Sequence, residues 1–177
     1  MLLVPSSGGT TSARLFALGV AIVGAGELLR LWGVHHIGVI SRTRSDRLGP
    51  LVDSGPFGLM RNPLYLGNVL LWLGFAVSAR LLWLAPIVAG LLAVEYHFIV
   101  RWEERLLESR IGERYRDYMR RVPRWIPRFV APSAGASGHA AFSWRETLYS
   151  ERGTLIAIVA GFALLALKAR VAPPALF

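Results

Sequence analysis

The sequence predicts an all-α, polytopic membrane protein with about four transmembrane segments, forming a single domain over residues 1–177. Two observations are compositional: hydrophobic residues make up 54% of the chain, and the mean hydropathy is +0.45. Both values exceed those of ordinary soluble domains. The third observation is the placement of charge, because the 20 basic and 11 acidic residues gather mainly between long apolar runs.

The apolar runs predict four membrane segments that include one helical hairpin. The first run, 15–38, is about 36 Å long as a helix, enough to cross a hydrocarbon core of about 30 Å. The second, 64–79, is about 24 Å long, and only Arg80 separates it from the third, 81–100. A connection this short requires an antiparallel hairpin. The fourth run, 154–167, is an additional segment that is short for a full span.

A charged segment, 101–121, follows the hairpin. Five apolar residues in it and just after it recur at a spacing of three to four, which predicts an amphipathic helix. They are Leu107, Ile111, Tyr115, Tyr118 and Val122. We expect this helix to lie on the cytoplasmic membrane surface or to fold back over the hairpin. Pro123 and Pro127 end it, and the Ala-, Ser- and Gly-rich stretch 131–141 is typical of a linker.

The distribution of arginine predicts the orientation. Arginines concentrate in 41–61 and 101–152, whereas Arg80 alone marks the hairpin tip. By the positive-inside rule, both arginine-rich regions face the cytoplasm and both chain ends lie outside, as in a protein of the plasma (inner) membrane of a prokaryote. Nucleic-acid binding is not expected, because no basic stripe is free of adjoining apolar segments. Cysteine is absent and the four histidines are scattered, so we expect no disulfide, thiol nucleophile or metal site.

The start of the second run carries the first candidate site residues. Arg61 and Asn62 precede Pro63, which suits the first turn of a helix and biases Asn62 toward an extended conformation. The helix start presents free N–H groups and partial positive charge, suited to a carboxylate or phosphate. Tyr65 lies about one turn further on. The same residues also suit a simple anchor of the helix at the lipid headgroups, and this alternative stays open.

A pair of acids, Glu103 and Glu104, lies at the other end of the hairpin. His97, Arg101 and Glu104 share one helix face by their spacing. Glu103 points about 100° away from Glu104, so one carboxylate can face a pocket while the other meets arginine or water. Ordinary solvated charge is the alternative for such a pair. The hairpin adds weight to a functional role, because it returns this helix end to the neighbourhood of Arg61.

Two further pairs of polar residues lie inside apolar runs. Glu27 and Arg30 have the spacing of an intramembrane ion pair, and Glu95 and His97 lie near the end of the third run. Such residues are costly in lipid and usually face protein or a polar cavity. For both pairs, a role in holding helices together and a role toward a substrate stay equally open.

With these residues in view, residues 30–128 resemble the isoprenylcysteine carboxyl methyltransferase and phospholipid methyltransferase superfamily of membrane enzymes. Two blocks, one on each side of the hairpin, carry the resemblance. The first reads LVDSGPF at 51–57 and RNPLYLG at 61–67, and the second reads EE at 103–104, IGERYRDY at 111–118 and RVP at 121–123. Paired blocks across one hairpin are more specific than either block alone.

The resemblance implies methyl transfer from S-adenosylmethionine, held on the cytoplasmic side, to a lipid-like or prenylated acceptor that enters from the bilayer. This cofactor carries an ammonium, a carboxylate and a sulfonium group. Glu103 or Glu104 can accept hydrogen bonds from the ammonium, whereas Arg61 and the helix start can hold the carboxylate. The other residues expected at the cofactor are Asn62 and, against the adenine, Leu51, Val52 and Tyr65. Arg101 and Glu95 are the catalytic residues expected to orient the acceptor.

Asn62 departs from the family pattern, which more often has histidine at this place. Asparagine can form hydrogen bonds but cannot take a proton near neutrality. Because a carboxylate acceptor needs no base, we favour O-methylation of the isoprenylcysteine-carboxyl type. The alternative is N-methylation of a phospholipid amine, of the phosphatidylethanolamine type, with Glu95, His97 or Glu104 taking the proton.

Two interpretations of other classes also stay open. Membrane reductases of the steroid 5α-reductase type look similar over the Arg-x-Pro-x-Tyr and Tyr–Pro blocks but use NADPH. A non-enzymatic membrane scaffold would use the Arg/Glu-rich helix to bind anionic lipid or a partner. The Glu103-Glu104 pair and the short chain favour the methyltransferase.

Overall fold

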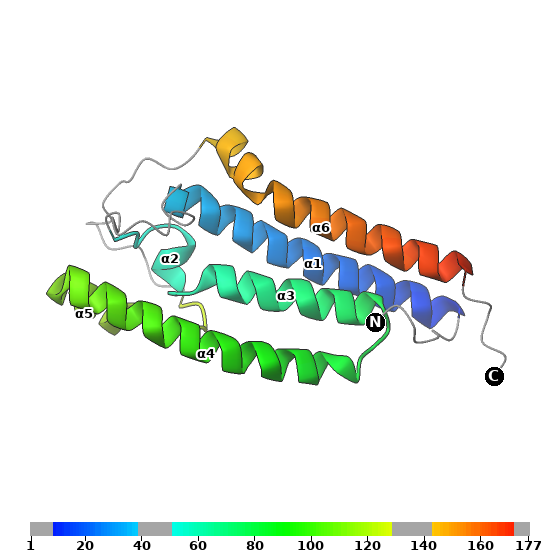
Figure 1. The fold of residues 1–177 in the computed structure, drawn as a ribbon, viewed down its shortest axis with the longest axis horizontal. Coiled ribbons are helices and arrows are strands. Elements are labelled where there is room, and N and C mark those ends of the chain that lie inside the picture. Colours follow the sequence, from blue (N-terminus) through cyan, green and yellow to red (C-terminus); the bar gives the residue numbers. More distant parts are fainter. Residues whose placement is uncertain (1–8, 39–50, 129–142, 172–177) are drawn as a thin grey trace.

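The computed structural model describes residues 9–38, 51–128 and 143–171, and within these ranges it is built of helices, with no strand (Figure 1). The helices are α1 (Gly9–Ile37), α2 (Pro56–Leu59), α3 (Pro63–Ser78), α4 (Leu84–Ile111), α5 (Glu113–Arg121) and α6 (Trp144–Val171). Three of them, α1, α4 and α6, are long and apolar enough to cross a membrane, and α3 is a shorter apolar helix. The predicted fold class, an all-α membrane protein, is confirmed.

The four long helices lie next to one another across the molecule in the order α6, α1, α3, α4 (Figure 1). The small helix α2 lies at the end where α3 begins, and the second half of α4 returns to that same end. At the edge of this row of helices, α6 packs on its neighbours through aromatic rings. Phe162 packs against Phe75 of α3 and Phe16 of α1, with ring centroids 5.0 Å and 5.9 Å apart.

The contact between α1 and α3 is the most extensive one in the described part of the chain, and glycine makes it possible. A Cβ on Gly26 would lie 2.8 Å from the carbonyl oxygen of Gly67, and a Cβ on Gly74 would lie 2.7 Å from the backbone nitrogen of Val23. Side chains cannot approach a backbone so closely, so the two helices touch where small residues face each other. The same close approach lays the stem of Arg30 against Gly67.

The hairpin between α3 and α4 turns at Arg80, as predicted. Arg80 is left-handed, with φ +58°. Its amide donates to the carbonyl oxygen of Val77, and the amide of Leu81 donates to that of Ala76, both at 2.9 Å. This is the hydrogen-bond pattern of a Schellman cap, which ends α3 and reverses the chain. The next helix begins at Leu84, slightly later than the predicted third run.

The predicted boundary between the third membrane segment and the charged helix is wrong. α4 continues without a break from Leu84 to Ile111. Its second half is rich in arginine, glutamate and leucine, which are good helix formers, and it contains no glycine or proline. The break comes instead at Gly112, where φ is +67°, and α5 follows it.

The apolar stripe of this region folds back onto the protein. Three residues of the stripe, Tyr115, Tyr118 and Val122, form one buried cluster with Leu51. The last turns of α4 pack against this cluster through Leu107 and Ile111. The sequence predicted a helix that lies on the membrane surface or folds back onto the protein. In the structure these side chains pack against the protein.

The fourth membrane segment is longer than predicted, because α6 begins at Trp144 rather than at residue 154. Its first turns are polar and lower the local hydropathy, but a capping box starts the helix there. The amide of Ser143 donates to the carboxylate of Glu146 at 2.9 Å, and the amide of Glu146 donates to the Ser143 hydroxyl at 3.3 Å. The predicted linker, 131–141, lies outside the described residues.

Candidate functional site

A short segment after α5, residues 122–128, is hydrogen-bonded to the turn that precedes α3. The amide of Arg61 donates to the carbonyl oxygen of Pro123 at 2.9 Å, and the side-chain amide of Asn62 donates to the carbonyl oxygen of Arg124 at 3.1 Å. Asn62 itself is not helical, with φ −126° and ψ 53°. These bonds hold the sequence block before the hairpin against the block that follows it.

Three charged side chains, Arg61, Glu104 and Arg124, meet beside this segment. Nη1 of Arg61 lies 3.0 Å from Oε1 of Glu104, and the two side chains are only 12% and 11% exposed. Arg124 donates to both oxygens of the same carboxylate, from Nε to Oε1 at 3.0 Å and from Nη2 to Oε2 at 2.6 Å. The cluster holds two guanidinium groups and one carboxylate, so one positive charge is left for an anionic ligand to balance.

Arg61 keeps unused hydrogen-bonding capacity. Its Nη1 is close enough to Glu104 for an ion pair but not in hydrogen-bond geometry, and its buried Nε has no acceptor among the described residues. A buried donor without an acceptor is costly, and a ligand carboxylate would satisfy it. The first turn of α3, which begins at Pro63, adds free N–H groups and partial positive charge at the same place.

Glu103 has different surroundings from its neighbour. Its Oε1 accepts a hydrogen bond from the hydroxyl of Tyr65 at 2.9 Å, across the hairpin from α4 to α3. The ring of Tyr65 packs on that of Tyr96, with centroids 4.7 Å apart. Glu103 is half-buried, and no arginine pairs with it in the described part of the chain. It is thus a carboxylate with one engaged oxygen beside the Arg61 cluster.

The buried tyrosines of α5, Tyr115 and Tyr118, lie next to these charged side chains. Burial raises the pKa of Tyr115 to about 12, and burial also raises the pKa of Tyr118, so both hydroxyls stay protonated at neutral pH. The hydroxyl of Tyr118 donates to the carbonyl oxygen of Phe57 at 2.8 Å. Leu51 is buried within this cluster, and Val52 beside it is half-buried.

The sequence profile of the phospholipid methyltransferase family matches residues 15–114, more than half of the chain. The chain belongs to that family. The matched range takes in α1 to α4, including Arg61, Tyr65 and the pair Glu103-Glu104. Arg124 and α6 lie beyond it.

Two bacterial metal-resistance proteins and one yeast enzyme are similar to this phospholipid methyltransferase family member. The cobalt-zinc-cadmium resistance protein CzcN of Cupriavidus metallidurans is 33% identical over 117 residues, which is 66% of the chain and 51% of that protein. The nickel-cobalt-cadmium resistance protein NccN of Alcaligenes xylosoxydans xylosoxydans is 32% identical, over 66% of the chain and 52% of its own length. Phosphatidyl-N-methylethanolamine N-methyltransferase of Saccharomyces cerevisiae is 33% identical over 95 residues, 49% of the chain and 44% of the enzyme.

The chain thus spans about half the length of the curated relatives it matches. No solved structure is significantly similar to it.

No described contact joins the two residues expected to orient the acceptor to the Arg61 cluster. Glu95 and Arg101 are exposed on α4, as is His97. Glu104 was expected to share a face with His97 and Arg101, but it is turned inward and buried. Arg101 differs from Glu104 by about 60° in direction, but His97, seven residues away, points almost the same way. Glu104 is buried because Arg61 and Arg124 pack against it at that end of α4.

Arg124 is a member of the candidate site that the sequence did not predict. It follows α5, and its contact with Glu104 joins residues 20 positions apart. The only local signal is an arginine held between Pro123 and Pro127, where the chain can no longer be helical. The two prolines predict a loop around Arg124, but they do not predict which residue the Arg124 side chain contacts.

A second polar cluster, centred on Arg30, lies inside the membrane-spanning part. The predicted pair with Glu27 is loose, with 3.7 Å between Nε of Arg30 and Oε2 of Glu27. Arg30 instead donates to Oε2 of Glu151 in α6, from Nη2 at 2.5 Å and from Nε at 3.2 Å. It also donates to the hydroxyl of Thr154 at 3.3 Å and to the side-chain oxygen of Asn68 in α3.

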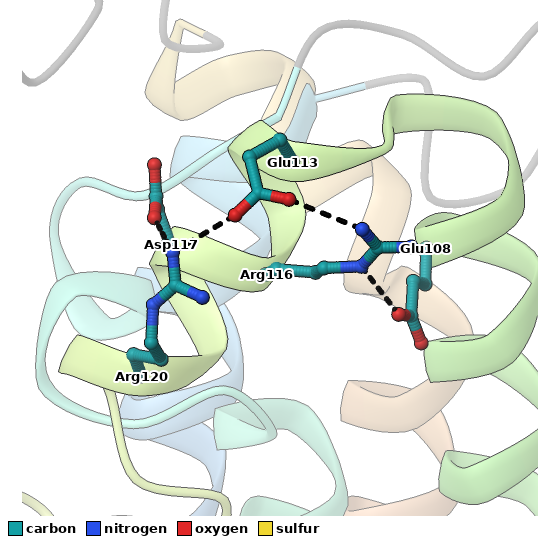
Figure 2. Close-up of polar contacts among 5 residues, drawn as sticks. All are labelled: Glu108, Glu113, Arg116, Asp117 and Arg120. Carbon is teal, nitrogen blue, oxygen red and sulfur yellow. Dashed lines mark hydrogen bonds and ion pairs between the residues drawn. The ribbon is translucent and has the colours of Figure 1, made fainter.

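Five charged residues lie around the break between α4 and α5, four of them exposed and Glu108 half-buried (Figure 2). They are Glu108, Glu113, Arg116, Asp117 and Arg120. Arg116 donates to Glu108 at 2.8 Å and to Glu113 at 3.1 Å, while Arg120 donates to Glu113 at 3.0 Å and to Asp117. The hydrogen bonds from Arg120 and Arg116 lower the pKa of Glu113.

Across the described ranges, no three His, Cys, Asp or Glu side chains gather as a metal site requires.

Proposed function

We propose that the chain is a membrane enzyme that transfers a methyl group from S-adenosylmethionine to a lipid-like acceptor in the bilayer. The observation that carries the proposal is the meeting of the Arg61–Glu104 pair with the Tyr65–Glu103 pair across the hairpin. It places a buried cation beside a half-buried carboxylate, the two charges that the amino-acid end of this cofactor needs. Membership of the phospholipid methyltransferase family supports the same reaction.

Arg61 and Glu103 are proposed to hold the two ends of that amino-acid group. The Nε atom of Arg61 lacks an acceptor, and the start of α3 beside it favours negative charge. Glu103 accepts one hydrogen bond from Tyr65 and can accept others from an ammonium group. The bound cofactor supplies the methyl group as an electrophile on its sulfonium. The protein's part is then to position the reactants and exclude water.

Glu104 is proposed to serve the cofactor site through the two arginines. Both of its oxygens are engaged by Arg61 and Arg124, so it fixes where the guanidinium groups lie. Asn62 braces the same corner through its bond to the backbone of Arg124. Leu51, with Val52 and the ring of Tyr65, is the proposed contact surface for the adenine.

A phospholipid amine is the acceptor with the most support. The family to which the chain belongs and the name of the yeast relative both concern phospholipid headgroups. Glu95 and Arg101 stay our proposed orienting residues, because they are exposed on α4 where a lipid in the surrounding bilayer can reach them. Arginine-rich regions on the side of the site favour a cytoplasm-facing site in a prokaryotic plasma membrane.

Carboxyl O-methylation of the isoprenylcysteine type is the second candidate, and Asn62 is the observation that favours it. The side-chain amide of Asn62 is used as a donor to the Arg124 carbonyl oxygen, so this residue is a brace and not a base. A carboxylate acceptor requires no base, whereas an amine acceptor does.

The test uses washed membranes that contain the expressed chain, incubated with S-adenosylmethionine carrying a tritiated methyl group. Label in organic-soluble phospholipid that stays on the headgroup after alkaline treatment supports amine methylation. Label that alkali releases from peptide as volatile methanol supports the carboxyl acceptor instead. Membranes with an Arg61→Gln variant serve as the control. Methyl transfer is rejected if neither product exceeds that control.

A further inference from the structure

We propose that the intramembrane cluster around Arg30 is an acceptor subsite, in which Glu27 binds the headgroup amine of the acceptor lipid and takes its proton. This role rests on the proposed function with a phospholipid amine as acceptor. It concerns residues that the proposed cofactor site does not use.

All four long helices contribute to the cluster. Glu27 and Arg30 come from α1, Asn68 from α3 and Glu151 from α6. Tyr96 of α4 joins them, because its hydroxyl lies next to the side chain of Asn68. A polar site shared by every long helix of a small membrane protein is costly in lipid and marks a place where function is expected.

The charges of the cluster do not balance. Glu151 is 1% exposed, and Arg30 neutralises it through two direct hydrogen bonds. Glu27 is 6% exposed, and neither of its oxygens has a hydrogen-bond partner among the described residues. The carboxylate of Glu27 points toward the cluster, since its Oε2 lies 3.7 Å from Nε of Arg30. This distance is too long for a hydrogen bond.

A donor with positive charge would complete the surroundings of the Glu27 carboxylate. A buried carboxylate without donors is unfavourable unless a proton or a cation neutralises it. A protonated primary or secondary amine supplies two or three N–H donors together with a positive charge. It is also the group that a phospholipid amine methyltransferase has to bind.

The cluster is connected to the candidate cofactor site by direct contacts. Asn68 lies next to Tyr96, the ring of Tyr96 packs on that of Tyr65 with centroids 4.7 Å apart, and the hydroxyl of Tyr65 donates to Glu103. Asn68 and Tyr65 lie about 4.5 Å apart along the axis of α3. An amine at Glu27 and the amino-acid end of a cofactor at Glu103 would thus both lie next to the Tyr65–Tyr96 pair.

The amine needs a base because a protonated nitrogen has no lone pair. Glu27 takes one proton from the ammonium group, giving a neutral amine and a carboxylic acid. The lone pair of the amine then forms the new bond to the methyl carbon, the bond from that carbon to sulfur breaks, and its electron pair stays on sulfur. The other bases considered from the sequence are less suited, since Glu95 and His97 are exposed and Glu104 is held by two arginines.

The test compares the full-length wild type with Glu27→Gln in detergent–lipid micelles, with phosphatidyl-N-methylethanolamine as the probe. Turnover of the variant is expected to fall by about 100-fold or more at neutral pH, because a general base is lost. Binding of S-adenosylmethionine and the melting temperature are expected to stay unchanged. Raising the pH from about 7 to about 9 increases the neutral fraction of the amine about 100-fold and is expected to restore much of the variant's turnover.

Glu108→Gln, at the surface end of α4, is the matched control and is expected to leave turnover unchanged. The subsite is overturned if Glu27→Gln turns over like the wild type, or if its turnover falls together with cofactor affinity and is not rescued at high pH. Binding of the probe, measured by native mass spectrometry against phosphatidylglycerol, keeps the two proposals apart. If the wild type binds the amine lipid through Glu27 but methylates nothing, the proposed function fails and the subsite stands.

Discussion

At the scale of single residues, the two adjacent glutamates of α4 show how one helical step separates two roles. Glu104 is buried between Arg61 and Arg124, while Glu103 is half-buried and accepts a hydrogen bond from Tyr65. Neighbouring residues on a helix point about 100° apart, so they meet different elements. Glu104 can thus fix the arginines while Glu103 stays available to a cationic group.

The change Glu104→Gln tests this division. The cofactor carries one net positive charge, and removing a carboxylate from a cluster that already has excess positive charge makes the site less favourable for it. We expect the affinity for S-adenosylmethionine to weaken by about 1–3 kcal/mol, because the charge-assisted hydrogen bonds from Arg124 and the ion pair with Arg61 are also lost. Isothermal titration of the detergent-solubilised chain measures it, with Glu108→Gln as the control. Equal affinities of Glu104→Gln and wild type would count against the role.

At the scale of the elements, close helix packing and the α4–α5 junction each depend on a few atoms. The contact between α1 and α3 exists because Gly26, Gly67 and Gly74 leave no side chain between the backbones. The junction exists because Gly112 turns with positive φ and Arg116 of α5 pairs with Glu108 of α4 across it.

Gly74→Ala is expected to separate α1 from α3. The new Cβ would lie 2.6 Å from Cγ2 and 2.7 Å from the backbone nitrogen of Val23, so the helices have to move. We expect a loss of stability of about 1–3 kcal/mol, as for other overpacked cores. Gly24→Ala is the matched control, because among the described residues no atom outside the adjoining backbone of α1 lies within 4 Å of its new Cβ. Thermal unfolding followed by tryptophan fluorescence distinguishes them, and similar melting temperatures for both variants would contradict the packing argument.

Glu113 is expected to make the stability of α5 sensitive to acid. The arginines at its carboxylate lower its pKa in the folded chain, so it stabilises the fold above its ordinary pKa of about 4.3. This contribution is lost as the pH falls through the lowered value. The difference in melting temperature between wild type and Glu113→Gln should therefore be present at neutral pH and close in acid. It should also shrink in high salt, because the group is exposed. A difference that grows in acid would refute the assignment.

At the scale of the whole molecule, local patterns predicted much of the fold but only part of the site. Apolar runs and the lone Arg80 were enough for the membrane class and the hairpin, because both depend on neighbouring residues. The start of α6 was missed, since its polar first turns hide a capped helix from hydropathy. Arg124 and Glu151 were missed for a different reason. Their partners, Glu104 and Arg30, lie far away in the chain, and no local spacing encodes such contacts.

The orientation of the whole chain leads to the last prediction, which uses its lack of cysteine. Leu82 is exposed at the hairpin tip, and Ser109 is exposed at the other end of α4, about 38 Å away along the helix. If the arginine-rich site end faces the cytoplasm, Leu82→Cys should react with a membrane-impermeant maleimide in intact cells. Ser109→Cys should react only after the membrane is opened. Labelling of Ser109→Cys alone in intact cells would place the site outside, and labelling of both would show that α4 does not cross the membrane.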